Sequence, residues 1–119
     1  MKYKPTDNIK PTVREDYSKK IIFDITDLPD GGHMLQEVTI PPKTKQRSHY
    51  HEIQTEIFYI LEGEAELIIN DQRFIAKPSD AFVCSPGDKH NIWNKSDKAF
   101  KLLVFKVNRP EDSEDSIWE

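Results

Sequence analysis

Short strand-like runs, separated by turn residues, constrain the fold of this chain most strongly. Turn signals recur at intervals of roughly 8 to 12 residues, a spacing typical of an all-β sandwich or small barrel. No window shows the sustained apolar spacing that predicts a helix, and the 8 prolines are scattered along the chain. The runs rich in β-branched and aromatic residues cover 19–25, 33–40, 56–69 with a break near Gly63, 73–76, 80–85, 91–94 and 99–107.

The length of 119 residues is sufficient for one domain with a buried core. Charged residues make up 32% of the chain and concentrate at its two ends. We therefore expect a single barrel domain over residues 21–108, a polar N-terminal arm over 1–20 and an acidic C-terminal tail over 109–119. These arms can pack on the barrel, pack on a partner subunit or stay loose. Tyr17 and Ile117–Trp118 are the large apolar groups through which they would dock.

The composition argues against several partners and locations. The formal net charge is −4 and no basic face is apparent, so we expect no nucleic-acid partner. No stretch approaches the roughly 20 apolar residues of a membrane span, and the first residues lack the apolar run of a secretory signal. Cys84 is the single cysteine, so no intrachain disulfide can form. We expect a cytoplasmic protein with no membrane partner.

The segment "RSHYHEIQTEIF" contains two histidines and a glutamate at a spacing that needs an explanation. His49 and His51 are two residues apart, so on a strand both side chains project to the same face. Glu56 follows at an odd offset and would point to the opposite face of one continuous strand. If Glu56 joins the histidines, the chain must therefore bulge or turn within the polar residues 52–55.

His90 follows a Pro-Gly turn and would open another strand. If the sheet curls back, this histidine points into the same interior as His49, His51 and Glu56. Three imidazoles and one carboxylate suit Fe, Mn, Ni, Zn or Co as divalent ions, and leave positions open for water or substrate. A His-x-His pair alone is more often a surface or satisfied pair. The remaining histidine, His33, follows "DGG" and is expected in a loop.

The chain resembles the cupin family in two spaced motifs. The first motif of that family is a glycine, five residues, His-x-His, three or four residues, a glutamate, six residues and a glycine. His49, His51, Glu56 and Gly63 match this spacing, but Lys43 occupies the opening glycine position.

The second cupin motif is a glycine, five residues, Pro-x-Gly, two residues, a histidine, three residues and an asparagine. Gly87, His90 and Asn94 match it, whereas Ser79 replaces the opening glycine and Ser85 the proline. These departures fall at turns, so we expect the turns to differ slightly.

The resemblance implies a cupin jelly-roll barrel, or double-stranded β-helix, of two antiparallel sheets. It also implies that His49, His51, Glu56 and His90 bind one divalent metal ion, whose identity among Mn, Fe, Ni, Zn and Co stays open. Cupins of this size are often dimers, so a homodimer is expected.

Several residues near the motifs are candidates for contact with a small-molecule ligand. Each has an ordinary alternative: Arg47 as a solvated charge, and the apolar residues as core. Cys84 is expected to be a buried, inert thiol. The candidates for ligand contact are Arg47, Gln54, Phe58, Phe82 and Ile92.

The favoured interpretation is a metal-dependent enzyme acting on a sugar, carboxylate or dicarbonyl compound, such as a dioxygenase, isomerase or decarboxylase. The alternative is a non-catalytic module that binds or senses a sugar or another small molecule. A structural or storage role is a third interpretation, and the retained ligand positions disfavour it. No residue beyond the four ligand candidates stands out as a general acid or base.

Overall fold

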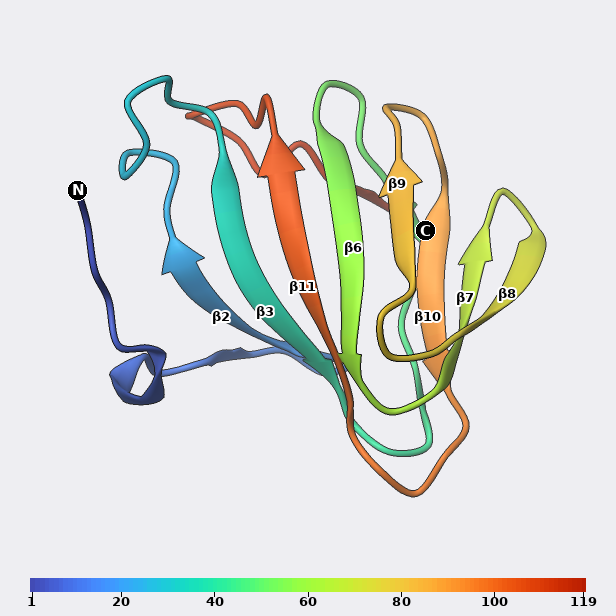
Figure 1. Ribbon diagram of the computed structural model, residues 1–119. Coiled ribbons are helices and arrows are strands. Elements are labelled where there is room, and N and C mark those ends of the chain that lie inside the picture. The colour runs from blue at the N-terminus through green and yellow to red at the C-terminus, as the bar shows by residue number, and fades with distance from the viewer.

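A computed structural model describes residues 1–119, which form two antiparallel sheets packed face to face (Figure 1). The first sheet contains, in spatial order, β1 (Thr12–Val13), β2 (Ser18–Phe23), β3 (Met34–Ile40), β11 (Phe100–Val107), β6 (Thr55–Glu62) and β9 (Ala81–Cys84). The second contains β12 (Ile117–Trp118), β5 (His49–Tyr50), β10 (His90–Asn94), β7 (Ala65–Ile69) and β8 (Gln72–Ala76), and β4 (Thr44–Lys45) pairs with β10. A short 3-10 helix, η1 (Thr6–Asn8), precedes β1. The predicted all-β jelly roll of two antiparallel sheets is confirmed.

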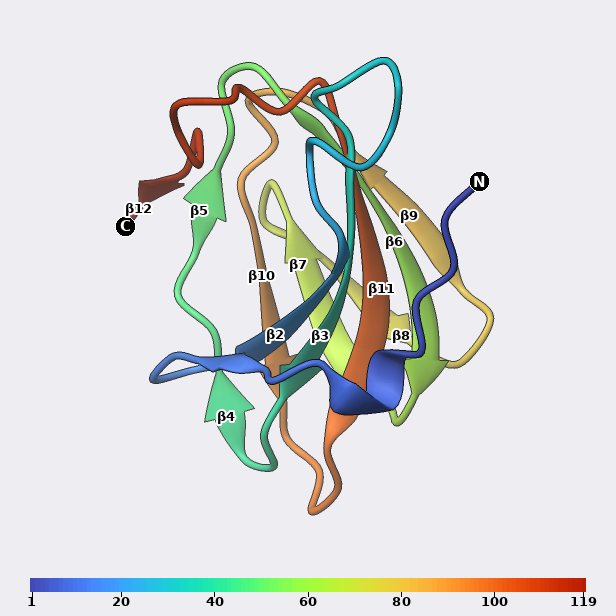
Figure 2. The same cartoon turned by 90° about the vertical axis from the view of Figure 1, so that its left-hand side faces the viewer.

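Every run that the sequence singled out coincides with a strand to within one or two residues at each end, and the break near Gly63 separates β6 from β7. The ends of the chain also take part in the sheets. β1 and the start of β2 fall within residues 1–20, and β12 falls within residues 109–119. Figure 2 shows β12 beside β5 at one edge of the barrel, with the C-terminus next to it.

Alternation along the strands separates the core from the outer surface. In β6, Glu56, Phe58 and Ile60 are buried, whereas Ile57 and Tyr59 are 39% and 44% exposed. This two-residue period is the one expected for strands with one face on a core. The apolar core consists of Val38, Ile40, Phe58, Ile60, Ala65, Leu67, Ala76, Cys84, Ile92, Phe100, Leu102 and Val104.

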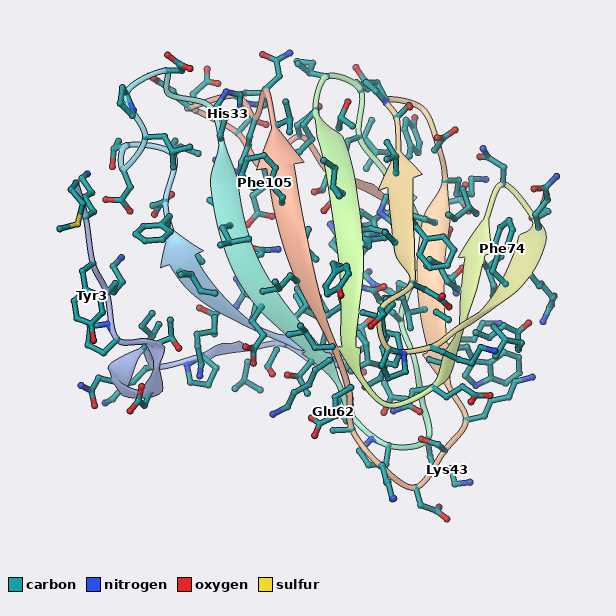
Figure 3. The ribbon with its side chains drawn as sticks, viewed as in Figure 1. Tyr3, His33, Lys43, Glu62, Phe74 and Phe105 are labelled. Carbon is teal, nitrogen blue, oxygen red and sulfur yellow. The ribbon has the colours of Figure 1, made fainter.

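The turn positions of the two motifs keep a left-handed backbone even where glycine is replaced. Lys43 and Ser79 have φ angles of 55° and 76°, a conformation that costs a residue with a Cβ about 1 kcal/mol. Figure 3 shows Lys43 in the loop at one end of the barrel. Gly63 is a stricter requirement, because an added Cβ would lie 2.8 Å from the Ala99 carbonyl oxygen.

The structure contains no helix with the length and apolar character needed to cross a bilayer.

Asn94, the last residue of the second motif, ties two loops together at the end of β10. It is fully buried, and its Nδ2 atom lies 2.8–3.2 Å from three backbone carbonyl oxygens, those of Ile40, Pro41 and Lys98. Its Oδ1 atom accepts hydrogen bonds from the Ser96 amide and hydroxyl at 3.1 and 2.7 Å. The side chain therefore satisfies backbone groups that would otherwise be buried without partners.

We expect Asn94→Ala to lower the free energy of unfolding by about 2–4 kcal/mol, because several buried polar groups lose their partner. Asn91→Ala is the matched control. Asn91 is also buried but donates only one hydrogen bond, to the Gln46 carbonyl oxygen, so about 1 kcal/mol is expected. Urea unfolding of both variants measures the difference, and equal losses would contradict this role for Asn94.

Candidate functional site

Four polar side chains from separate segments converge inside the barrel. His49 lies in β5, His51 directly follows that strand, Glu56 is near the start of β6, and His90 opens β10. Each is at most 7% exposed, and their possible ligand atoms all lie within 4.8 Å of one another. Residues 51–54 form a loop between β5 and β6 and interrupt the strand. Glu56 can therefore face inward despite its odd offset from the histidines, as the sequence required.

The hydrogen-bond geometry of two histidines directs their Nε2 atoms onto one carboxylate. His51 Nδ1 lies 2.6 Å from the Asp115 carbonyl oxygen, and His90 Nδ1 lies 2.9 Å from that of Asp88. Their Nε2 atoms lie 2.5 and 3.0 Å from Glu56 Oε1. A carbonyl only accepts, so each Nδ1 carries a proton. A ring that is also protonated at Nε2 donates to the Glu56 oxygen, whereas a ring without that proton presents its Nε2 lone pair to a cation. A divalent cation between the two Nε2 atoms and Glu56 Oε1 could take the place of those protons and bind all three atoms.

The electrostatics favour the protonation states that bind metals at two of the four positions. Burial, reinforced by repulsion from His90, lowers the pKa of His49 to about 3, so this ring is neutral. Burial opposes ionisation of Glu56, but hydrogen bonds from His51 and His90 hold its pKa well below the usual range. Burial also opposes the charge on His90, yet contacts with Cys84 and Glu56 raise its pKa to about 10. A metal would therefore compete with a proton on His90.

Residues 114–118 form a strap that crosses the site and fixes the loop between β5 and β6. The Asp115 carboxylate accepts hydrogen bonds from the backbone amides of Glu52, Ile53 and Gln54 at 2.8–3.2 Å. Gln54 Nε2 donates to the Glu114 carbonyl oxygen at 2.6 Å. Because the Asp115 carbonyl also accepts from His51, the strap orients one of the candidate ligands directly.

The aromatic end of the strap covers His49. Trp118 pairs with His49 across β12 and β5, and its ring stacks on that imidazole with centroids 4.2 Å apart. Tyr17 stacks on Trp118 at 6.3 Å, and the Arg47 guanidinium lies 4.8 Å from the Trp118 ring. Groups from both ends of the chain thus dock on the barrel at this site.

A cavity of about 50 Å³ adjoins the four side chains, and the strap contributes to its wall. Two of the five residues proposed for ligand contact, Phe58 and Ile92, line it. The other three lie elsewhere, for different reasons. The Arg47 guanidinium lies over the Trp118 ring, Gln54 donates to the strap, and Phe82 packs against Phe74 with centroids 5.8 Å apart.

Two further expectations concern residues outside the cavity. His33 lies in a loop, as expected, where its ring stacks on Phe105 at 6.2 Å, and Figure 3 shows this pair at the end of the barrel opposite Lys43. Cys84 is a buried free cysteine within the core, as expected. Neither residue lines the cavity.

Several polar residues that the sequence analysis did not single out also line the cavity. Gln36 in β3 and Lys106 in β11 are 4% and 7% exposed and line the cavity. Burial lowers the pKa of the Lys106 ammonium, although Glu56 acts in the opposite direction. The sequence contains a pattern that could have identified Lys106. It follows Phe100, Leu102 and Val104 at two-residue intervals, so it shares their inward face of the strand.

The comparison with known proteins agrees with this architecture. A family model described as the cupin domain matches residues 36–106. An uncharacterized protein of Methanocaldococcus jannaschii is 32% identical over 69 residues, which are 58% of this chain and 55% of that protein. An oxidoreductase of Arthrobotrys oligospora is 34% identical over 73 residues, 57% of this chain and 27% of that protein. The chain thus spans about half of one relative and about a quarter of the other.

Among solved structures, a predicted oxalate decarboxylase of Thermotoga maritima has a TM-score of 0.80 and 20% identity, covering 87% of this chain and 96% of that chain. This likeness shows a shared fold. The family match extends from Gln36 to Lys106 and includes all four converging side chains and most of both sheets. This chain belongs to the cupin domain family.

Proposed function

We propose that this protein binds one divalent metal ion through His49, His51, Glu56 and His90, and acts through it on a small polar molecule. The observation that carries the proposal is the convergence of two Nε2 atoms on Glu56 Oε1, while each Nδ1 faces a backbone carbonyl oxygen. Three imidazoles and a carboxylate suit Mn, Fe, Ni, Zn or Co. Without a metal, four buried polar side chains would be a costly use of the barrel interior.

The residues around the cluster would shape the chemistry. A divalent ion at this position would supply Lewis-acid stabilisation of charge on substrate oxygens. Phe58 and Ile92 give the cavity apolar walls that limit water, and Trp118 covers His49. The carbonyls of Asp88 and Asp115 hold two imidazoles in the orientation that a metal ligand needs.

An enzyme is the function that we favour, as a metal-dependent dioxygenase, isomerase or decarboxylase. The relatives named as an oxidoreductase and as a predicted oxalate decarboxylase support an enzyme with this fold. A non-catalytic module that binds a sugar or another small molecule is the second candidate. The cavity, about 50 Å³ with the strap in place, matches a compact molecule better than a sugar.

We also propose that the protein is a homodimer. Large apolar side chains on the outer face of β6 and β9 support this: Tyr59 is 44% exposed, Leu61 40% and Val83 58%. Light scattering at micromolar concentration should give twice the chain mass of 13.9 kDa. A mass of one chain at all concentrations would contradict the dimer.

The metal proposal predicts one bound ion per chain after loading with Mn, Ni or Co. We expect His51→Ala to weaken metal binding at least about 100-fold, because a ligand is lost and Glu56 loses a partner. Calorimetric titration and metal analysis measure the effect, and circular dichroism checks the fold. His33→Ala is the control, because His33 lies outside the cluster. Full metal occupancy in His51→Ala, or none in the wild type, would refute the ligand assignment.

Because the strap covers the site, we expect a bound metal ion to exchange slowly with solvent. Trp118→Ala removes the ring stacked on His49, so stripping of the metal by excess chelator should accelerate about tenfold or more, equivalent to about 1.4 kcal/mol in barrier. Trp93→Ala is the matched control, because Trp93 stacks with Lys45 and Lys95 and does not line the cavity. Equal stripping rates in the two variants would show that the strap does not shield the site.

A further inference from the structure

Lys106 is a charged residue in a row of core positions. Along β11, Phe100, Leu102 and Val104 point inward and are at most 3% exposed, and Lys106 occupies the next inward position at 7% exposed. It stands opposite Glu56 in the register between β11 and β6, so it lies at the end of the barrel that holds the histidines. Its side chain lines the cavity.

No acidic side chain pairs with this ammonium. Glu56, the buried carboxylate nearest along the sheet, contacts His51 and His90 through Oε1 and forms no ion pair with Lys106 within 4.0 Å. The other lysine of the cavity, Lys19, differs in this respect, because its Nζ atom lies 3.7 Å from Glu114 Oε1. Burying an unpaired ammonium opposes folding, so a residue of this kind needs a compensating partner.

Gln36 supplies a buried polar atom without a partner to the same cavity. It points inward from β3, the strand next to β11, where it stands opposite Val104. Its side chain is 4% exposed, and its Oε1 atom is buried without a hydrogen-bond partner. Buried polar atoms are nearly always paired, so this atom also indicates a missing ligand or an ordered water.

We propose that Lys106 is a specificity-determining residue that selects a small organic acid as the ligand of this site. The inference rests on the proposed function, because the same ligand would meet the metal on its other side. A carboxylate oxygen would accept a charge-assisted hydrogen bond from Lys106 Nζ, and Gln36 would bond a hydroxyl group or water next to it.

Charge and size both support this ligand class. A neutral sugar can hydrogen-bond to an ammonium but does not neutralise it, whereas a carboxylate does both in a site of low dielectric constant. The cavity of about 50 Å³ admits only a few non-hydrogen atoms with the strap in place. The compact hydroxy acids and dicarboxylic acids fit these two limits together.

Glycolate and glycolamide test the proposal, because they have the same size and differ in charge. The wild type is loaded with Co(II), and each compound is titrated while the visible absorption of the cobalt is followed. We expect Lys106→Met to weaken glycolate binding at least tenfold, to leave glycolamide binding within twofold, and to leave Co(II) affinity within threefold. The melting temperature of Lys106→Met should rise, since an unpaired buried charge is removed.

Lys19→Met is the matched control, because it removes a lysine of the same cavity that already has an acidic neighbour. We expect less than threefold loss of glycolate affinity in this variant. Lys106→Gln provides a second substitution and should also lose glycolate binding while binding Co(II).

Three results would overturn the proposal in distinguishable ways. If the wild type does not bind Co(II), the proposed function itself fails, and the Lys106 role with it. If Lys106→Met and Lys106→Gln bind Co(II) and glycolate as the wild type does, the metal site stands and the role of Lys106 is refuted. If Lys19→Met loses as much glycolate affinity as Lys106→Met, the selection reflects general positive charge and not this residue.

Discussion

The contact of two imidazoles with a single carboxylate oxygen is the interaction on which the rest of the site depends. Glu56 is buried, and an isolated carboxylate there would be strongly destabilising. His51, which follows β5, and His90, which opens β10, compensate it, and each is oriented through its far nitrogen by a backbone carbonyl. The barrel therefore has to bring the ends of β5, β6 and β10 together within hydrogen-bonding distance. A divalent cation is the partner that such a convergence suits best.

The two ends of the chain extend this arrangement beyond the motifs. The strap orients His51 through one carbonyl, fixes the loop that follows it through one carboxylate, and covers His49 with one indole. Tyr17, from the start of the chain, stacks on that indole in turn. Site geometry and the docking of the chain ends are therefore coupled, so a substitution in the strap should alter the site without touching a candidate ligand.

Much of this could be predicted from residue spacing. Two-residue alternation placed His49 and His51 on one face, and the parity of Glu56 required the break that the structure has between β5 and β6. The strap contacts could not be predicted, because they depend on backbone carbonyl positions in an acidic tail. The same limit applies to Arg47 and Gln54, whose contacts with Trp118 and Glu114 are not visible in the sequence. Lys106 was visible as a charge in an apolar row, and was missed because lysine is usually exposed.

Anomalous diffraction from crystals of the metal-loaded protein distinguishes a metal centre from a metal-free, hydrogen-bonded cluster. We expect one strong peak per chain, about 2.0–2.3 Å from one nitrogen each of His49, His51 and His90 and from a Glu56 oxygen. A peak bound by other residues would contradict it. So would crystals soaked in Mn, Ni and Co salts that show no peak and keep both imidazoles hydrogen-bonded to the carboxylate.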